Sequence, residues 1–223
     1  MTASLDFAGA ARPGPVVLTG RYGRVEKLDP QRHGLALWEA MRDEPALWDY
    51  MPYGPFNSGE QFQSWITERA TLADPYVYAI VAPDGRALGI AALMRITPEM
   101  GVIEVGHIAY SPALQRTPLG TEAQFLLARY AFDTLGYRRY EWKCNALNAA
   151  SRRAAERYGF SFEGIFRQHM IVKGKNRDTA WYSIIDTEWP ARRLAFESWL
   201  APANFDAHGR QKASLMSFMA NSG

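Results

Sequence analysis

A short polar segment in the middle of the chain has the residue types of an anion site. It begins where a predicted strand ends at Tyr110 and runs from Gln115 to Gly120 into a predicted helix. Thr117 is suited to cap that helix, and Pro118 to be its first residue. The first backbone amides of a helix have no internal partner, and the helix dipole makes that end partly positive. The segment could therefore bind a phosphate group.

Three backbone amides and one side chain are the expected donors of this site. With Thr117 as the cap, the free amides would be those of Leu119, Gly120 and Thr121. Gly120 would also let a ligand approach the backbone closely, and Arg116 adds a positive charge. Many helices begin with Thr-Pro, so these residues alone favour a phosphate site only weakly.

Two side chains on the preceding predicted strand, residues 102–110, could move protons. Glu104 could act as a base, and His107 lies three residues further along. An odd–even count puts them on opposite faces of a strand, so only one would face a substrate unless a bulge intervenes. Each could equally be a polar group that is simply paired within the fold.

Polar residues also follow the predicted strand at 137–144. Asn148 and Ser151 open a predicted short helix, where Ser151 could serve a reaction or act only in capping. Cys144 ends the strand and has no histidine near it in the sequence. We therefore interpret Cys144 as a structural thiol, because a buried cysteine behaves as a small hydrophobic residue.

An aromatic loop precedes these elements. Residues 48–56 (WDYMPYGPF) contain two prolines and a glycine, so they can form neither a regular helix nor an inner strand. Their rings could plug the core beneath the loop, or they could form a wall of a substrate pocket. The candidate substrate-binding residues are Trp48, Tyr50, Tyr53 and Phe56.

The elements that must position these groups alternate along the chain. Period-two patterns and turn signals predict strands at 22–28, 76–82, 87–96, 102–110, 137–144, 162–172 and 179–187. Helical periodicity and capping residues predict helices that begin near Asp29, Asp43 and Ser58, and others at 119–135, 148–158 and 189–200. This order indicates a mixed sheet with helices on its faces, in the α/β or α+β class.

The sequence predicts a central domain with an extension at each end. Residues 1–15 are rich in Ala, Gly and Pro and are expected to be a flexible N-terminal arm. Residues 16–200 form one predicted domain, and residues 201–223 are a C-terminal extension. Apolar residues near the end of that extension suggest that it could cover the site of a neighbouring subunit in a homodimer.

Composition narrows the classes of protein. Of the 223 residues, 48% are hydrophobic and 22% are charged, which is typical of a soluble globular protein. A net charge of +2 does not indicate a nucleic-acid binder, and the cluster at 152–157 could be a solvated helix face or a contact with a phosphorylated cofactor. A single cysteine excludes an intrachain disulfide and suits the cytoplasm, and no apolar run is long enough to span a membrane.

Two groups of residues together resemble the GNAT superfamily of N-acyltransferases, in particular its RimJ/RimL-like branch. The family's pyrophosphate loop reads Gln/Arg-x-x-Gly-x-Gly/Ala; Gln115 matches its first position and Gly120 its last. The segment 121–123 then resembles the Thr-Glu-Ala of this branch. A second block, and a late Arg-Asp pair, stand here as Asn148, Ser151, Gly159-Phe160, Glu163-Gly164 and Arg177-Asp178. The resemblance covers roughly residues 18–190.

The chain departs from the family pattern at two positions. Pro118 replaces the middle glycine of the loop, and proline has no N–H to donate to a phosphate. Ala155 stands where relatives often have a tyrosine that protonates the coenzyme A thiolate. Ser151 is the expected substitute for that tyrosine.

The resemblance implies a fold and an activity. The fold would be a central mixed, mostly antiparallel sheet of about seven strands, flanked by helices and splayed between the fourth and fifth strands. The activity would be transfer of the acetyl group of acetyl-CoA to a primary amine, by direct attack in a ternary complex. The alternative is a non-catalytic acyl-CoA-binding or sensor protein. No metal is implied.

The resemblance also assigns residues to roles. The catalytic candidates are Glu104, His107 and Ser151. Backbone amides at 108–110 would polarise the thioester, and the pantetheine arm would lie between the strands at 102–110 and 137–144. The candidate cofactor-binding residues are Ile108, Ala109, Tyr110, Gln115, Arg116, Leu119, Gly120, Thr121, Asn148 and Ser151.

Overall fold

A central sheet organises the computed structural model, which describes residues 5–220. Within these residues the sheet has eight strands in the order β1-β2-β3-β4-β5-β6-β8-β7. The strands are β1 (Val17–Thr19), β2 (Arg24–Lys27), β3 (Tyr76–Val81), β4 (Ala87–Thr97), β5 (Val102–Tyr110), β6 (Arg139–Asn145), β7 (Ser161–Val172) and β8 (Lys175–Ile185). Neighbouring strands are antiparallel except β5 and β6, which are parallel. The predicted mixed, mostly antiparallel sheet is confirmed.

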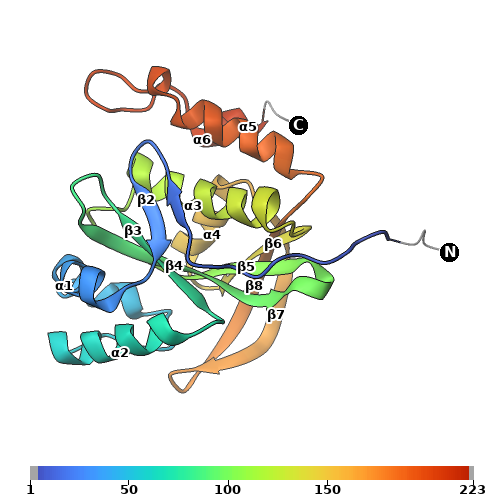
Figure 1. Ribbon diagram of the computed structural model, residues 1–223. Coiled ribbons are helices and arrows are strands. Elements are labelled where there is room, and N and C mark those ends of the chain that lie inside the picture. The colour runs from blue at the N-terminus through green and yellow to red at the C-terminus, as the bar shows by residue number, and fades with distance from the viewer. Residues whose placement is uncertain (1–4, 221–223) are drawn as a thin grey trace.

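Helices cover both faces of the sheet (Figure 1). Helices α1 (Pro30–Met41) and α2 (Gly59–Thr71) lie on one face; α3 (Pro118–Arg129) and α4 (Ala149–Arg157) lie on the other, with α5 (Trp189–Leu200) and α6 (Leu215–Ala220) beyond α3. The shorter turns are η1 (Pro45–Trp48), η2 (Pro98–Met100), the π-helical η3 (Tyr130–Thr134) and η4 (Pro202–Asn204).

Two apolar clusters hold these layers together. Alternate residues of β3 enter opposite clusters: Tyr78 and Ile80 pack toward α3, whereas Val77 and Ala79 pack toward α1 and α2. This is the pattern of an inner strand that is buried on both faces. Burial of this much apolar surface is the main favourable contribution to folding.

Local signals predicted where most helices begin. Asp29 caps α1 by accepting from the amides of Gln31 and Arg32, and Ser58 caps α2 by accepting from Gln61. Both agree with the preference of short polar side chains for the residue before a helix.

Several predicted elements have different bounds, and the short strand β1 was not among the seven strands expected. The helix expected over 119–135 changes at Tyr130 into the π-helical η3. The strand expected from Tyr137 begins at Arg139. The last strand, expected over 179–187, begins already at Lys175 and ends at Ile185. The hairpin connection, expected over 173–177, is only Lys173 and Gly174, which adopt the positive φ values (49° and 73°) of a tight hairpin turn.

Segments near both ends of the described residues pack against the domain, Ala10 and Ala11 at one end and Leu215 and Met219 of α6 at the other. The amides of Ala10 and Ala11 donate to the carbonyls of Pro98 and Leu135. The expected N-terminal arm begins, and the expected C-terminal extension ends, in residues 1–4 and 221–223, which lie outside the described residues. Between residues 5 and 220, no helix has the length and apolar character needed to cross a membrane.

Candidate active site

The sheet opens where β5 and β6 run side by side. Their pairing extends only from Val102 opposite Arg139 to Val105 opposite Trp142. Both strands continue beyond this point, β5 to Tyr110 and β6 to Asn145. The edge of β5 that faces β6 is therefore unpaired over its second half. This gap is the predicted splay between the fourth and fifth of the expected strands.

A β-bulge in β5 sets which side chains face the gap. Ala92 pairs with Gly106 and Ile90 with Ala109, so one residue of β4 stands opposite His107 and Ile108. His107 has a φ of 49°, in the left-handed region. A bulge of this kind shifts the alternation of side chains by one residue. The shift is visible in the core, because Val105 packs toward α3 whereas Ala109 packs toward α1 and α2.

The bulge brings Glu104 and His107 together. Both line a cavity of about 130 Å³, which we call the inner cavity. The odd–even count had left their relative orientation dependent on a bulge, and the bulge is present.

Glu104 is held by two cations. Its Oε2 lies 2.6 Å from Nη1 of Arg95 and 3.0 Å from Nζ of Lys143, and only 4% of its side chain is exposed. Lys143 Nζ also lies 2.6 Å from Oε2 of Glu141. The pairing continues to β7 through Arg139, which contacts Glu141 and Glu163. We call this row of alternating charges the charge ladder: Arg95, Glu104, Lys143, Glu141, Arg139 and Glu163.

His107 is neutral at physiological pH. Burial lowers its pKa to about 4, with the nearby positive charges of Arg69, Arg95 and Arg177 acting in the same direction. Its Nδ1 lies 2.7 Å from the hydroxyl of Tyr53, whose ring stacks on it at 5.5 Å. The tautomer that this hydrogen bond selects decides whether Nε2 carries a proton.

Ser151 reaches the gap from α4. Its Oγ accepts a hydrogen bond of 3.0 Å from Nε1 of Trp142, which leaves the hydroxyl hydrogen able to donate. Its amide donates to Oδ1 of Asn148, the cap of α4. Cys144 is buried nearby, and burial raises the pKa of its thiol. A protonated thiol is a poor nucleophile, in agreement with a structural role.

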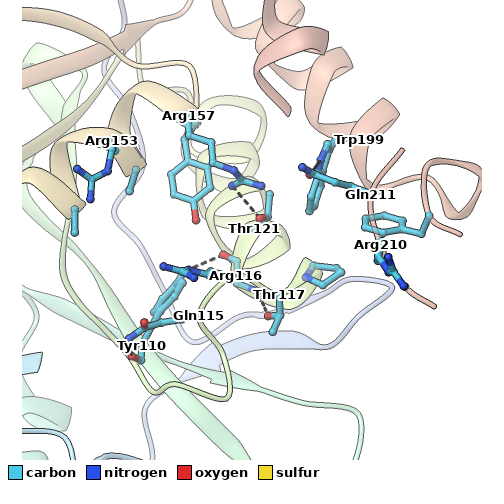
Figure 2. Close-up of a pocket in the computed structure, with 17 residues that line it drawn as sticks. Tyr110, Gln115, Arg116, Thr117, Thr121, Arg153, Arg157, Trp199, Arg210 and Gln211 are labelled. Atoms are coloured by element: carbon cyan, nitrogen blue, oxygen red, sulfur yellow. Dashed lines mark hydrogen bonds between the residues drawn. The ribbon is translucent and has the colours of Figure 1, made fainter. Parts of the chain in front are cut away.

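A larger basic cavity lies at the other end of the gap. This outer cavity has a volume of about 710 Å³ and is lined by the loop before α3, by α4 and by the C-terminal segment. Figure 2 shows Arg116 and Thr117 at the start of α3, Arg157 bonded to Thr121, and Arg210 on the opposite side. Among the described residues that line it, none is acidic and four are arginines: Arg116, Arg153, Arg157 and Arg210.

The start of α3 differs in detail from the prediction. Thr117 does cap the helix, but its Oγ1 accepts from the amide of Gly120 at 3.1 Å, and its carbonyl accepts from the amide of Thr121 at 3.3 Å. Two of the three amides expected to be free, those of Gly120 and Thr121, are therefore engaged, and only Leu119 is left of that set. Thr117 therefore competes with a ligand for the backbone amides of Gly120 and Thr121.

Packing also explains Gly120. A Cβ there would lie 2.8 Å from the carbonyl oxygen of Leu114 and 3.3 Å from the ring of Tyr110. The glycine is thus required by the close approach of helix and loop, whether or not a ligand approaches as well. Gln115 supports the same corner, because its Nε2 donates to the carbonyl of Tyr110 at 2.8 Å.

A third cavity connects the outer and inner cavities. This channel has a volume of about 360 Å³. It shares Tyr110 and Gln115 with the outer cavity, and Ile108 and Ser151 with the inner cavity. Ala109 pairs with Ile90 of β4 and its side chain faces the core, so this candidate cofactor-binding residue does not line the channel, unlike its neighbours Ile108 and Tyr110.

The aromatic loop is divided between two environments. Tyr53 contacts His107, and Tyr50 lines both the inner cavity and the channel. Trp48 and Phe56 pack against Trp65 in the cluster beneath the loop and do not line the cavities that contain His107 or Ser151.

Sequence reasoning missed several residues of these cavities. Lys143 carried a signal, because a lysine at an inward position of a buried strand demands a charged partner. Arg95 carried none. Arg210 and Phe205 lie in a segment without periodicity, so their place beside α3 could not be read from the sequence. Within residues 5–220, no three His, Cys, Asp or Glu side chains are grouped so as to hold a metal ion.

Comparisons with known proteins agree with this geometry. Residues 28–161 match the model of the family described as "Acetyltransferase (GNAT) domain". Two curated proteins of Bacillus subtilis are similar: the probable N-acetyltransferase YjcK is 30% identical over 54% of this chain and 67% of its own length. The putative ribosomal N-acetyltransferase YdaF is 28% identical over 49% of this chain and 60% of its own length, so the match spans less than two thirds of YdaF.

Solved structures resemble between about three quarters and nearly all of the chain. A GCN5-related N-acetyltransferase from Brucella melitensis is 46% identical, covers 96% of this chain and 99% of its own, and has a TM-score of 0.94. A probable GNAT-family acetyltransferase from Chromobacterium violaceum is 41% identical, covers 86% of this chain and 96% of its own, and has a TM-score of 0.80. An acetyltransferase from Salmonella typhimurium, 20% identical with a TM-score of 0.65 and coverage of 76% and 99%, shares the fold.

Proposed function

Because the chain belongs to the GNAT family of acetyltransferases, we propose that it transfers the acetyl group of acetyl-CoA to a primary amine. The observation that carries this proposal is the unpaired gap between β5 and β6. It joins an arginine-lined cavity at one end to a cavity containing Glu104 and His107 at the other.

The outer cavity suits the phosphates of coenzyme A. Its positive charge comes from Arg116, Arg153, Arg157 and Arg210, and guanidinium groups bind phosphate oxygens through paired hydrogen bonds. The channel suits the narrow pantetheine arm, because the free edge of β5 offers backbone groups with no strand partner. With two amides of the α3 terminus engaged by Thr117, side chains supply much of the phosphate binding.

The residues around the gap have distinct roles in this reaction. When bound, acetyl-CoA supplies an activated thioester; the amine nitrogen forms a C–N bond to its carbonyl carbon as the C–S bond breaks. Backbone amides at 108–110 polarise the carbonyl oxygen. Ser151 donates its hydroxyl hydrogen to the departing sulfur. Holding both substrates in one gap contributes to the rate by removing the entropy cost of their encounter.

The amine must lose a proton to Glu104 or His107. Oε2 of Glu104 already contacts two cations. In the tautomer whose Nδ1–H donates to Tyr53, the neutral ring of His107 keeps a lone pair on Nε2 that can take the proton. We therefore assign His107 as the group that takes the proton and Glu104 as the group that fixes the charge of the cavity. Because a pKa of about 4 makes His107 a weak base, this assignment requires that the amine reach the cavity in its neutral form and lose its proton only as the C–N bond forms.

The names of relatives suggest acceptors. YdaF is named a putative ribosomal N-acetyltransferase, and the Salmonella protein is titled as modifying the N-terminal serine of ribosomal protein L7/L12. A protein N-terminus is thus one candidate acceptor and a small amine the other, in keeping with the RimJ/RimL-like resemblance. The cytoplasmic location and the homodimer stay predictions.

The proposal is tested by thiol release from acetyl-CoA with a panel of primary amines. We expect Ser151→Ala to lower kcat by about 10²-fold, the lower end of the usual contribution of a proton donor, with little change in KM for acetyl-CoA. Ser64→Ala, on the exposed side of α2, is the matched control. An unchanged kcat in the Ser151 variant would remove that residue from the mechanism.

A second candidate function is acyl-CoA binding without catalysis. It is favoured by Ala155, which is fully buried and offers no hydroxyl where relatives often have a tyrosine. Tight binding of CoA in calorimetry, with no turnover of any amine, would select this reading. Absence of CoA binding would reject both.

A further inference from the structure

A fourth cavity extends the inner cavity away from the channel. This side cavity has a volume of about 460 Å³ and lies between the aromatic loop, the end of β6 and the β7–β8 hairpin. It shares Tyr50, Asn145 and Arg177 with the inner cavity. A molecule placed in both would have one end beside His107 and Glu104 and the other beside the hairpin. This is the position that an acceptor must take if acetyl-CoA enters from the opposite side.

Most cations around these two cavities already have partners. Arg95 and Lys143 are paired with Glu104, and Lys143 also with Glu141. Lys173 donates to the carbonyls of Trp48 and Gly54. Their charges are therefore committed to the structure of the site.

Two cations of the side cavity are not paired in this way: Lys175, which is exposed to solvent, and Arg177, which is partly buried. Within residues 5–220 its guanidinium makes no ion pair, and its Nε is buried without a hydrogen-bond partner. The neighbouring carboxylate of Asp178 points elsewhere, because its Oδ1 accepts from the amide of Gln168 and from Asn176. Burial lowers the pKa of Arg177, which reflects the cost of removing this charge from water. A buried donor without a partner is costly, so its presence calls for an external acceptor.

The electrostatic potential beside His107, where the acetyl group would be transferred, is positive, like the charge of Arg177. Arg177 and Arg95 both contribute to the low pKa of His107, so positive potential extends to that ring. The same potential favours the neutral form of a bound amine, which is the reactive form. It opposes any acceptor with a second ammonium group. Asp49 and Glu104 are the acidic side chains among the described residues of the two cavities, and Glu104 is already paired.

We propose that Arg177 binds a carboxylate of the acceptor, so that the substrates of this site are primary amines that also carry a carboxylate. This inference rests on the proposed function for the reacting end of the acceptor. The carboxylate can be that of a free amino acid or an acidic side chain near the N-terminus of a peptide, and both present the same chemistry to a guanidinium.

The test compares acceptors that differ in the charge of one group, with rates expressed per neutral amine because a carboxylate also raises the pKa of the amine beside it. L-Alanine is paired with L-alaninamide, and the peptide Ala-Asp-Ala-amide with Ala-Asn-Ala-amide; a diamine completes the set. For the wild-type protein we expect kcat/KM to be about tenfold or more higher for the carboxylate member of at least one pair, and lowest for the diamine. The pair that shows the difference identifies the source of the carboxylate.

Variants then locate the effect. Arg177→Met should raise KM for the preferred carboxylate acceptor about tenfold or more, change KM for the amide analogue much less, and leave KM for acetyl-CoA unchanged. Arg177→Lys should recover part of the affinity. Arg86→Met, on an exposed turn, is the matched control. Equal use of charged and uncharged acceptors by the wild type, or an equal loss on all acceptors in Arg177→Met, would overturn the proposal.

A binding measurement keeps the test independent of turnover. Calorimetry in the presence of CoA compares N-acetyl-L-alanine and N-acetyl-Ala-Asp-Ala-amide with their uncharged analogues. If no amine is acetylated but a carboxylate ligand binds more tightly and Arg177→Met abolishes the difference, the proposed function fails and the carboxylate site stands. If amines are acetylated but neither charge nor Arg177→Met matters, the proposed function stands and the carboxylate site fails.

Discussion

Lys143 determines the electrostatics of the inner cavity. Its side chain is 4% exposed, and its ammonium lies between the carboxylates of Glu104 and Glu141 and 3.9 Å from the ring of Trp181. Two buried carboxylates on neighbouring strands repel each other unless a cation separates them. Lys143 is therefore a positioning residue that holds Glu104 in place.

We expect Lys143→Met to lower the free energy of unfolding by about 3–5 kcal/mol, because it leaves buried carboxylates without their cation. Urea denaturation measures this change. Lys175→Met, at an exposed position of the hairpin, should change stability by less than about 0.5 kcal/mol. A Lys143 variant as stable as the wild type would show that Arg95 and Arg139 alone hold the ladder together.

His107 gives a pH-dependent signal. Its folded-state pKa of about 4 lies below the usual 6.5, so the unfolded chain takes up this proton first as the pH falls. The contribution of the neutral ring to stability is present above about pH 6.5 and is lost as the pH falls toward 4. NMR titration should find this ring with a pKa near 4, and His107→Gln should reduce the fall in stability between pH 7 and 5. A ring that titrates near 6.5 would contradict the buried, neutral His107.

At the scale of the element, the start of α3 shows how a cap and a ligand share donors. Thr117 satisfies the amide of Gly120 in the described structure. Pro118 follows it, and proline needs no partner for a missing N–H. Of the amides expected to be free at this terminus, only that of Leu119 is therefore left for a ligand.

We expect Thr117→Ala to lower the free energy of unfolding by about 1 kcal/mol, the usual effect of losing a cap. Because the substitution frees the Gly120 amide, it should leave CoA affinity unchanged or raise it. Denaturation and calorimetry measure the two effects. Thr67→Ala, exposed within α2, is the control. A stability loss with a parallel loss of CoA affinity would mean that Thr117 itself binds the ligand.

Caps were predictable from the sequence because a cap and the amide it binds are three or fewer residues apart. The bulge at His107 was not, because it depends on the register between β4 and β5. The engagement of the Gly120 amide was missed for a related reason: the sequence gives the capping residue but not which of several donors it takes. Glu104, His107 and Ser151 were thus identified as candidates by their residue types. That they line one cavity could be known only from the arrangement of the strands in the sheet.

At the scale of the molecule, the C-terminal segment completes the outer cavity. Trp199 Nε1 donates to Gln211, and the ring of Phe205 packs against Trp199 at 5.2 Å. These contacts hold Arg210 opposite Arg116 (Figure 2). The sequence suggested that this extension could cover a neighbour's site; in the structure it lies over the cavity of its own chain.

We expect Arg210→Ala to raise KM for acetyl-CoA about threefold to tenfold, because a guanidinium beside phosphate oxygens is lost from a solvent-open cavity. Arg86→Ala is the control. Steady-state kinetics and calorimetry with CoA measure the effect. An unchanged KM would place the phosphates on the Arg116 side alone.

The overall architecture was predictable to a large extent because the order of strands and helices, together with the motif spacing, restricts the possible topologies. The C-terminal segment was not, since nothing in residues 201–214 repeats with the period of a helix or strand. Its position depends on aromatic contacts with Tyr22 and Trp199, which are set only once the sheet and α5 have formed.

The charge ladder and the outer cavity must respond differently to dissolved salt. Mobile ions screen exposed charges over about 8 Å at physiological ionic strength and about 3 Å at 1 M, but they act much less on buried pairs. The pair of Glu104 and Lys143 is buried, whereas the arginines of the outer cavity meet a cavity open to solvent. If the outer cavity binds the phosphates of acetyl-CoA as proposed, rising ionic strength should therefore weaken that binding, while the buried charges around Glu104 should change little. Along one gap in its sheet, the protein thus has an outer cavity whose electrostatic interactions depend on salt and an inner cavity whose buried ion pairs depend on it much less.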